Sequence, residues 1–100
     1  MEKIWIGLCH VIPKKGFDNL IKGMGAFVNI VAISSNRKEF EILARETLSK
    51  YGFEMIDIQD VETLSERAKK VQISDSILEL AQSLNETYPI QFDSFHSYEQ

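Results

Sequence analysis

Cys9 and His10 are the most reactive side chains in this sequence, and they are adjacent in the chain. A thiol beside an imidazole could form an activated nucleophile. Both residues fall in a strand-like stretch, however, where neighbouring side chains point to opposite faces and cannot act on one atom. His96 is the only other histidine, and no metal-ligand spacing joins it to this pair. We therefore predict no catalytic site, no metal site and no cofactor.

Three carboxylates lie close together in the second half of the chain, at Asp57, Asp60 and Glu62. Paired carboxylates can perform acid–base catalysis when one of them is buried. The sequence places no apolar pocket or nucleophile beside these three. A solvated sheet edge, or an acidic surface that binds a partner, is the favoured interpretation. Glu86 and Asp93 extend the same acidic character toward the C-terminus.

The net charge of −4 hides a difference between the two halves of the chain. Residues 1–50 carry eight Lys and Arg against five Asp and Glu, whereas residues 51–100 carry three against ten. An acidic half can steer a basic protein partner and repels nucleic acid. Lys14, Lys15 and Lys22 could contact phosphates, but no aromatic-studded basic strand accompanies them, so nucleic-acid binding is disfavoured.

Asn29 is the one polar residue in the middle of the apolar run 25–34. A buried amide costs about 1–3 kcal/mol unless it finds hydrogen-bond partners. It therefore either pairs within the core or lines a groove on an uncovered face. The alternative to a binding protein is a small enzyme or ligand-binding domain with a pocket near Asn29 and His10. Gly23 and Gly25 form a lone G-x-G before a strand, the reverse of the order in phosphate-binding loops.

These residues must be positioned by one domain of 100 residues, long enough for a single core. Apolar patterning predicts strands at 3–13, 25–34 and 53–60, with a fourth at 88–95 that lies at an edge because of Pro89. The connection 14–24 could hold one helical turn at Phe17, Leu20 and Ile21, and residues 96–100 are expected to fray. No apolar run approaches the roughly 20 residues of a membrane span. The single cysteine favours the reducing cytoplasm.

The clearest helix signal lies at 37–51. Asn36 and Glu39 form a capping-box variant, and Gly52 follows at the position that ends a helix. The spacing of Glu46 and Lys50 predicts an ion pair one turn apart. A second capping box at Thr63 and Glu66 predicts a short helix over 64–70. A third helix is predicted from Ser74 or Asp75 onward, with its apolar stripe at Ile77, Leu80, Ala81 and Leu84.

The order strand, strand, helix, strand, short helix, helix, strand predicts an α+β fold. We expect a two-layer sandwich, in which a four-stranded, mostly antiparallel sheet carries the two main helices on one face. The second face of strand 25–34 would then be covered by the connection 14–24, by the short helix 64–70, by another subunit or by a partner. A structural homodimer formed through that face is therefore a further alternative.

The run Gly25-Ala26-Phe27-Val28-Asn29, the helix after it, and the later Ile58-Gln59-Asp60-Val61-Glu62 resemble small bacterial immunity proteins of polymorphic toxin systems, including contact-dependent growth inhibition. The resemblance covers residues 3–70 and rests on short apolar motifs. It implies a small cytoplasmic protein, not an enzyme, that binds one toxin domain and blocks its active site. Because many such toxins are nucleases with basic clefts, the acidic residues are the expected contacts. These are Asp57, Asp60, Glu62, Glu86 and Asp93, presented by a monomer or a homodimer.

Overall fold

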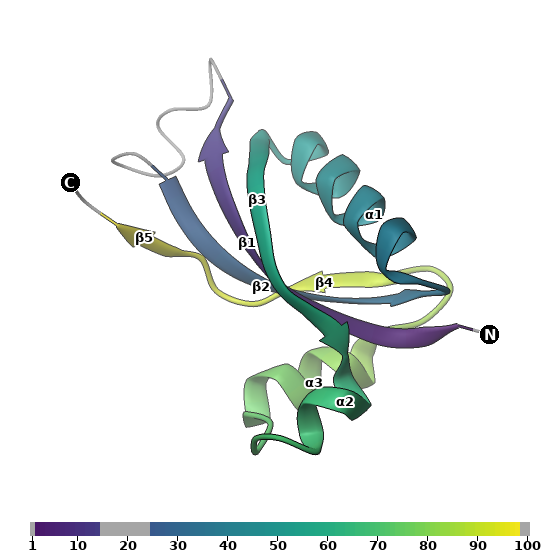
Figure 1. Ribbon diagram of the computed structural model, residues 1–100. Coiled ribbons are helices and arrows are strands. Elements are labelled where there is room, and N and C mark those ends of the chain that lie inside the picture. The colour runs from purple at the N-terminus through teal and green to yellow at the C-terminus, as the bar shows by residue number, and fades with distance from the viewer. Residues whose placement is uncertain (1, 15–24, 99–100) are drawn as a thin grey trace.

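Residues 2–14 and 25–98, the part described by this computed structural model, form an antiparallel sheet with three helices (Figure 1). The elements are β1 Lys3–Pro13, β2 Gly25–Ser34, α1 Arg37–Lys50, β3 Phe53–Thr63, α2 Leu64–Ala68, α3 Asp75–Ser83, β4 Ile90–Phe92 and β5 His96–Tyr98. The predicted α+β class with its antiparallel sheet is confirmed. The helical turn expected at Phe17, Leu20 and Ile21 lies outside the described residues, as do Lys15, Lys22 and Gly23.

The sheet has the strand order β3-β1-β2-β4. β5 also pairs with β2, at the start of β2, whereas β4 pairs with residues further along that strand. β1 and β2 are central because both of their faces are apolar, and they match the predicted strands 3–13 and 25–34. β3 runs three residues beyond the predicted strand 53–60 and forms one edge. Its register against β1 shifts between Ile6 and Leu8 and again between His10 and Val11. β3 is therefore a long edge strand with two irregularities.

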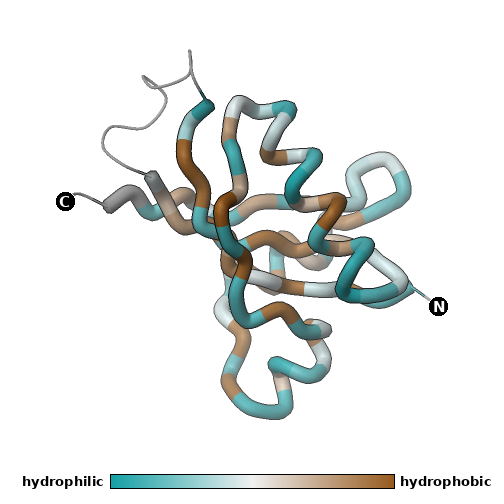
Figure 2. Tube along the Cα trace, turned by 45° about the horizontal axis from the view of Figure 1, so that its top comes forward, coloured by the Kyte–Doolittle hydropathy of each residue, from teal (hydrophilic) through white to brown (hydrophobic). Residues whose placement is uncertain are grey.

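α1 covers one face of the sheet. The helix begins at Asn36, whose side chain accepts a hydrogen bond from the Glu39 amide at 2.9 Å, and the chain turns away at Gly52, which has a φ of 88°. Hydrophobic stretches run along the strands beneath the helices (Figure 2). The buried core on this face consists of Cys9, Val11, Ala26, Val28, Ile30, Ala32, Phe40, Ala44, Leu48, Phe53 and Met55.

α3 covers part of the opposite face. Ile77 packs with Ile6 and Val31, and residues of α2 and of the loop before α3 surround this smaller cluster. The expectation that both main helices share one face is therefore wrong: α1 and α3 lie on opposite sides of the sheet (Figure 1). The reason is the alternation of side chains along β2. Ile30 faces α1 while Val31 faces α3, so burying both requires a helix on each side.

The C-terminal edge consists of two short strands where one strand over 88–95 was expected. β4 pairs with Ile30–Ala32 and β5 with Gly25–Phe27 of the same strand, β2. The start of the strand is delayed because the Asn85 side chain accepts hydrogen bonds from the amides of Thr87 and Tyr88 and forms a turn. The expectation that residues 96–100 fray is wrong for 96–98, which pair as β5.

Between β4 and β5 the chain leaves the regular ladder. The Asp93 amide still donates to the Asn29 carbonyl at 2.9 Å, but the Asp93 carboxylate accepts from the next amide, that of Ser94. Phe95 then turns inward, and its ring stacks on Phe53 with the centroids 4.9 Å apart. The hydrogen bond within Asp93-Ser94 and the contact of Phe95 with Phe53 therefore separate β4 from β5.

Candidate functional site

The side chains of Cys9 and His10 point to opposite faces, as predicted. Cys9 is fully buried beneath α1. Burial, with a smaller contribution from the charges of Asp57 and Glu41, raises the pKa of the Cys9 thiol to about 12. A thiol with this pKa stays protonated at neutral pH and is a poor nucleophile. The half-buried His10 stacks on Phe27 with the ring centroids 4.6 Å apart.

The acidic residues of β3 lie along the outer edge of the sheet. Glu54, Asp57 and Asp60 are exposed, and none of them forms an ion pair with a described Lys or Arg. Asp57 lies opposite His10 in the register of β1 and β3, and its carboxylate accepts a hydrogen bond from the Gln59 side chain at 2.8 Å. Within the described part of the chain, no Lys or Arg therefore pairs with the negative charge of Glu54 and Asp57 at this edge.

Asp60 occupies the irregular point of β3. Its φ is 55°, in the left-handed region that non-glycine residues seldom adopt. Arg67 from α2 donates to the Asp60 carbonyl at 2.6 Å, so α2 holds the backbone of this residue in place. Asp60 lines a shallow surface region together with Glu62, Arg67, Lys70 and Val71.

The Glu62 carboxylate forms ion pairs within the protein. It is 2.8 Å from Arg67 Nε and 2.5 Å from Lys70 Nζ, and the Glu62 side chain is only 16% exposed. Hydrogen bonds from Lys70 and then from Arg67 lower the pKa of Glu62. Glu62 therefore joins the end of β3 to α2, and both of its oxygens are occupied.

Glu86 and Asp93 lie at the other edge of the sheet. Glu86 is exposed in the turn before β4, and Asp93 is half-buried after it, 3.5 Å from the Ser76 hydroxyl of α3. Because β3 and β4 are the two ends of the strand order, the structure does not bring the five predicted contact residues together. Asp57 and Asp60 share one edge, and Glu86 and Asp93 share the other.

Asn29 lines an open groove of about 230 Å³ on the face that carries α3. Ile6, Arg67, the segment from Val71 to Ser74, and Ile77 form the rest of this groove. His10 does not line it, and the Arg67 guanidinium is held by Glu62 and the Asp60 carbonyl. The groove therefore supports the idea that Asn29 faces a recess, but it does not combine Asn29 with His10 as the ligand-binding alternative requires.

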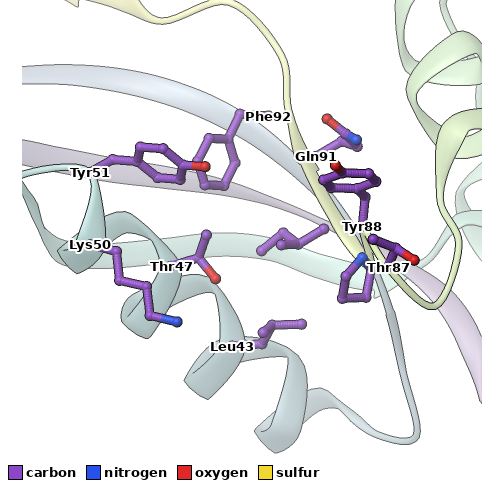
Figure 3. A pocket seen from close by; sticks show the side chains of 10 residues that line it. Leu43, Thr47, Lys50, Tyr51, Thr87, Tyr88, Gln91 and Phe92 are labelled. Atoms are coloured by element: carbon purple, nitrogen blue, oxygen red, sulfur yellow. The ribbon is translucent and has the colours of Figure 1, made fainter.

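A larger groove, of about 510 Å³, lies between α1 and β4 (Figure 3). One wall carries Leu43, Thr47 and Lys50 of α1 with Tyr51 at its end, and the other runs from Thr87 to Phe92. Tyr51 is 62% exposed, and its ring meets Phe92 edge-on at 5.8 Å between centroids. The sequence prediction did not include this groove. Two features of the sequence could have indicated it. One is Tyr51, which continues the apolar face of α1 past the end of the helix, and the other is Pro89, which predicts an edge strand.

Comparison with models of protein families, with curated proteins and with solved structures gives no match for this chain. Across the described ranges, no group of three or more His, Cys, Asp and Glu side chains is placed to hold a metal ion. None of the helices described here is long and apolar enough to cross a membrane. The function must therefore be argued from the surfaces described above.

Proposed function

We propose that this chain is a non-catalytic protein-binding domain, an immunity protein that neutralises a cognate toxin in the cytoplasm. The observation that carries the proposal is the acidic edge of β3, where Glu54, Asp57 and Asp60 are exposed and no described Lys or Arg forms an ion pair with them. Glu62 is left out of the contact because Arg67 and Lys70 already bind its carboxylate.

The form of this edge suits recognition by charge better than pairing of strands. Two register shifts and the left-handed Asp60 interrupt β3, and such irregularities, like charged side chains, discourage another chain from adding to an edge. A basic protein surface, such as the cleft of a nuclease toxin, is the complement of a row of carboxylates. Complementary charge mainly speeds association and excludes wrong partners.

The experiment has two stages. Affinity purification of the tagged chain from its native host, followed by mass spectrometry, identifies the partner. The double variant Glu54→Lys/Asp57→Lys is then compared with a control of the same net charge, Glu46→Lys/Glu79→Lys, whose exposed residues lie on α1 and α3. We expect the β3 variant to associate with the purified partner more slowly by on the order of tenfold at low salt. The control should associate at nearly the rate of the wild type.

High salt should remove the difference between the two variants, because exposed charges are screened. Two results would contradict the proposal. One is recovery of no basic protein partner from the host. The other is equal association rates for the β3 variant and its control at low salt.

A further inference from the structure

β4 presents a free backbone edge. The Ile33 amide donates to the Pro89 carbonyl, and the Asp93 amide donates to the Asn29 carbonyl, each at 2.9 Å. In an antiparallel ladder the groups of every second residue face the neighbouring strand. Gln91 therefore faces β2 together with Pro89 and Asp93. The amides and carbonyls of Ile90 and Phe92 point outward, away from β2, and no other strand of the described sheet lies beyond them.

The side chains of the same two residues border the groove toward α1. Ile90 and Phe92 pack against the core on that face, with Leu43 from α1 nearby. A strand added about 4.8 Å beyond β4 would direct alternate side chains to the same face, into the groove. The groove volume of about 510 Å³ lies within the range of sites that hold small ligands, so it has room for several side chains of a bound segment. Figure 3 shows Tyr51 and Tyr88 at its two ends.

Lys50 sets the charge that this groove prefers. Among the described residues, it is the only charged side chain that lines the groove. The ion pair with Glu46 that the helical spacing predicts is not formed, and no other described carboxylate pairs with Lys50. In a chain of net charge −4, this places beside the groove a positive group that no described carboxylate pairs with. A carboxylate on the bound segment would complete it.

We propose that β4 and the α1–β4 groove bind an extended segment of a protein partner, which adds to the sheet as a strand and places a carboxylate at Lys50. Strand addition supplies affinity through the outward groups of Ile90 and Phe92, and the groove supplies selectivity. β4 carries neither the charges nor the irregularities that interrupt β3, so its edge is open to pairing. This inference concerns a different surface from the acidic edge and does not depend on it.

A second copy of this chain suits the edge less well. The described lining of the groove contains no carboxylate that could meet the Lys50 of a second copy, and the short β4 is the same for either occupant. A partner segment can bring the carboxylate that this lining lacks.

The test is selection of a displayed library of random linear peptides against the folded chain. Enriched peptides are synthesised, and amide hydrogen exchange of the protein is measured with and without each. We expect peptides with alternating apolar residues and at least one carboxylate, and slower exchange at Ile90 and Phe92. Because Lys50 is exposed, Lys50→Met should weaken binding by at most about fivefold, and it should abolish the dependence of binding on salt.

The control variant is Lys38→Met, an exposed residue at the start of the same helix, which should leave the affinity unchanged. The Glu54→Lys/Asp57→Lys variant should also bind the peptides normally, which separates this inference from the proposed function. Three results would overturn it: no peptide enriched on the folded chain, protection that maps to β3 or elsewhere, or a doubled mass in solution with β4 protected in the absence of peptide.

Discussion

Gly7 of β1 lies against the ring of Phe40 in α1. A Cβ atom at Gly7 would be 3.0 Å from Phe40 Cε2, and 3.2 Å from a methyl group of Ile58 and of Val61. Phe40 is completely buried, and Gly7 lies where the register between β1 and β3 shifts. The helix therefore approaches the sheet at the one position of β1 that has no side chain.

We predict that Gly7→Ala lowers the free energy of unfolding by about 1–3 kcal/mol, the usual cost of overpacking a core. The φ of Gly7 is not in the left-handed region, so the loss comes from lack of space and not from backbone strain. Urea unfolding followed by circular dichroism measures it. The control is a double-mutant cycle with Phe40→Leu. If the crowding is between these two residues, the double variant loses clearly less stability than the sum of the single variants, whereas additive losses would refute it.

Asp60 offers a prediction about backbone strain. A left-handed conformation costs a residue with a Cβ roughly 1–2 kcal/mol, less for Asp, and glycine almost nothing. With a φ of 55°, Asp60→Gly should therefore be at least as stable as the wild type, while Asp60→Val should lose about 1–2 kcal/mol. Urea unfolding of both variants checks this. Equal stability of the valine and glycine variants would show that the residue is not strained.

Much of this fold follows from local patterns. β1 and β2 have the predicted ends because an apolar run stops at Pro13 in one and at the polar Ser34-Ser35 in the other. α1 has the predicted start because Asn36 caps it. The side of the sheet that α3 covers could not be read in this way, since the stripe containing Ile77 fits either face. The sequence did contain one indication: because β2 has apolar side chains on both faces, each face of the sheet must be covered by another element.

The sites were harder to predict because they join distant segments. The α1–β4 groove brings Tyr51 to Phe92, 41 positions later, through the pairing of β4 with β2. One of the two partners of Glu62 is Arg67, which lies five residues on across a junction of strand and helix, where the one-turn spacing rule does not apply. Both contacts depend on how the sheet and helices pack, which no local pattern specifies.

The ion pairs of Glu62 make stability depend on pH. Because hydrogen bonds from Lys70 and Arg67 lower its pKa in the folded state, Glu62 stabilises the fold above its unfolded pKa of about 4.5, and this contribution is lost as the pH falls through the folded pKa. We predict that Glu62→Gln is less stable than the wild type at pH 7, and that this loss of stability is smaller at pH 3. Urea unfolding at both values measures the difference.

The matched background for this comparison is Arg67→Met/Lys70→Met, in which Glu62 has lost both partners. There the change to Gln should have nearly the same effect at pH 7 and pH 3. A pH-dependent effect of Glu62→Gln that persists in this background would assign the dependence to some other interaction.

Cys9 gives a prediction about reactivity. With a pKa of about 12, the thiolate fraction at pH 8 is roughly a thousandfold below that of an ordinary exposed cysteine, and α1 covers the sulfur as well. The native chain should therefore react with an aromatic disulfide reagent at least about a thousandfold more slowly than the control Cys9→Ala/Ser94→Cys, whose thiol is at an exposed position. In denaturant the two chains should react at similar rates, since Cys9 is then exposed. Rapid labelling of native Cys9 at pH 8, without unfolding, would mean that the sulfur is accessible and would restore it as a candidate for chemistry.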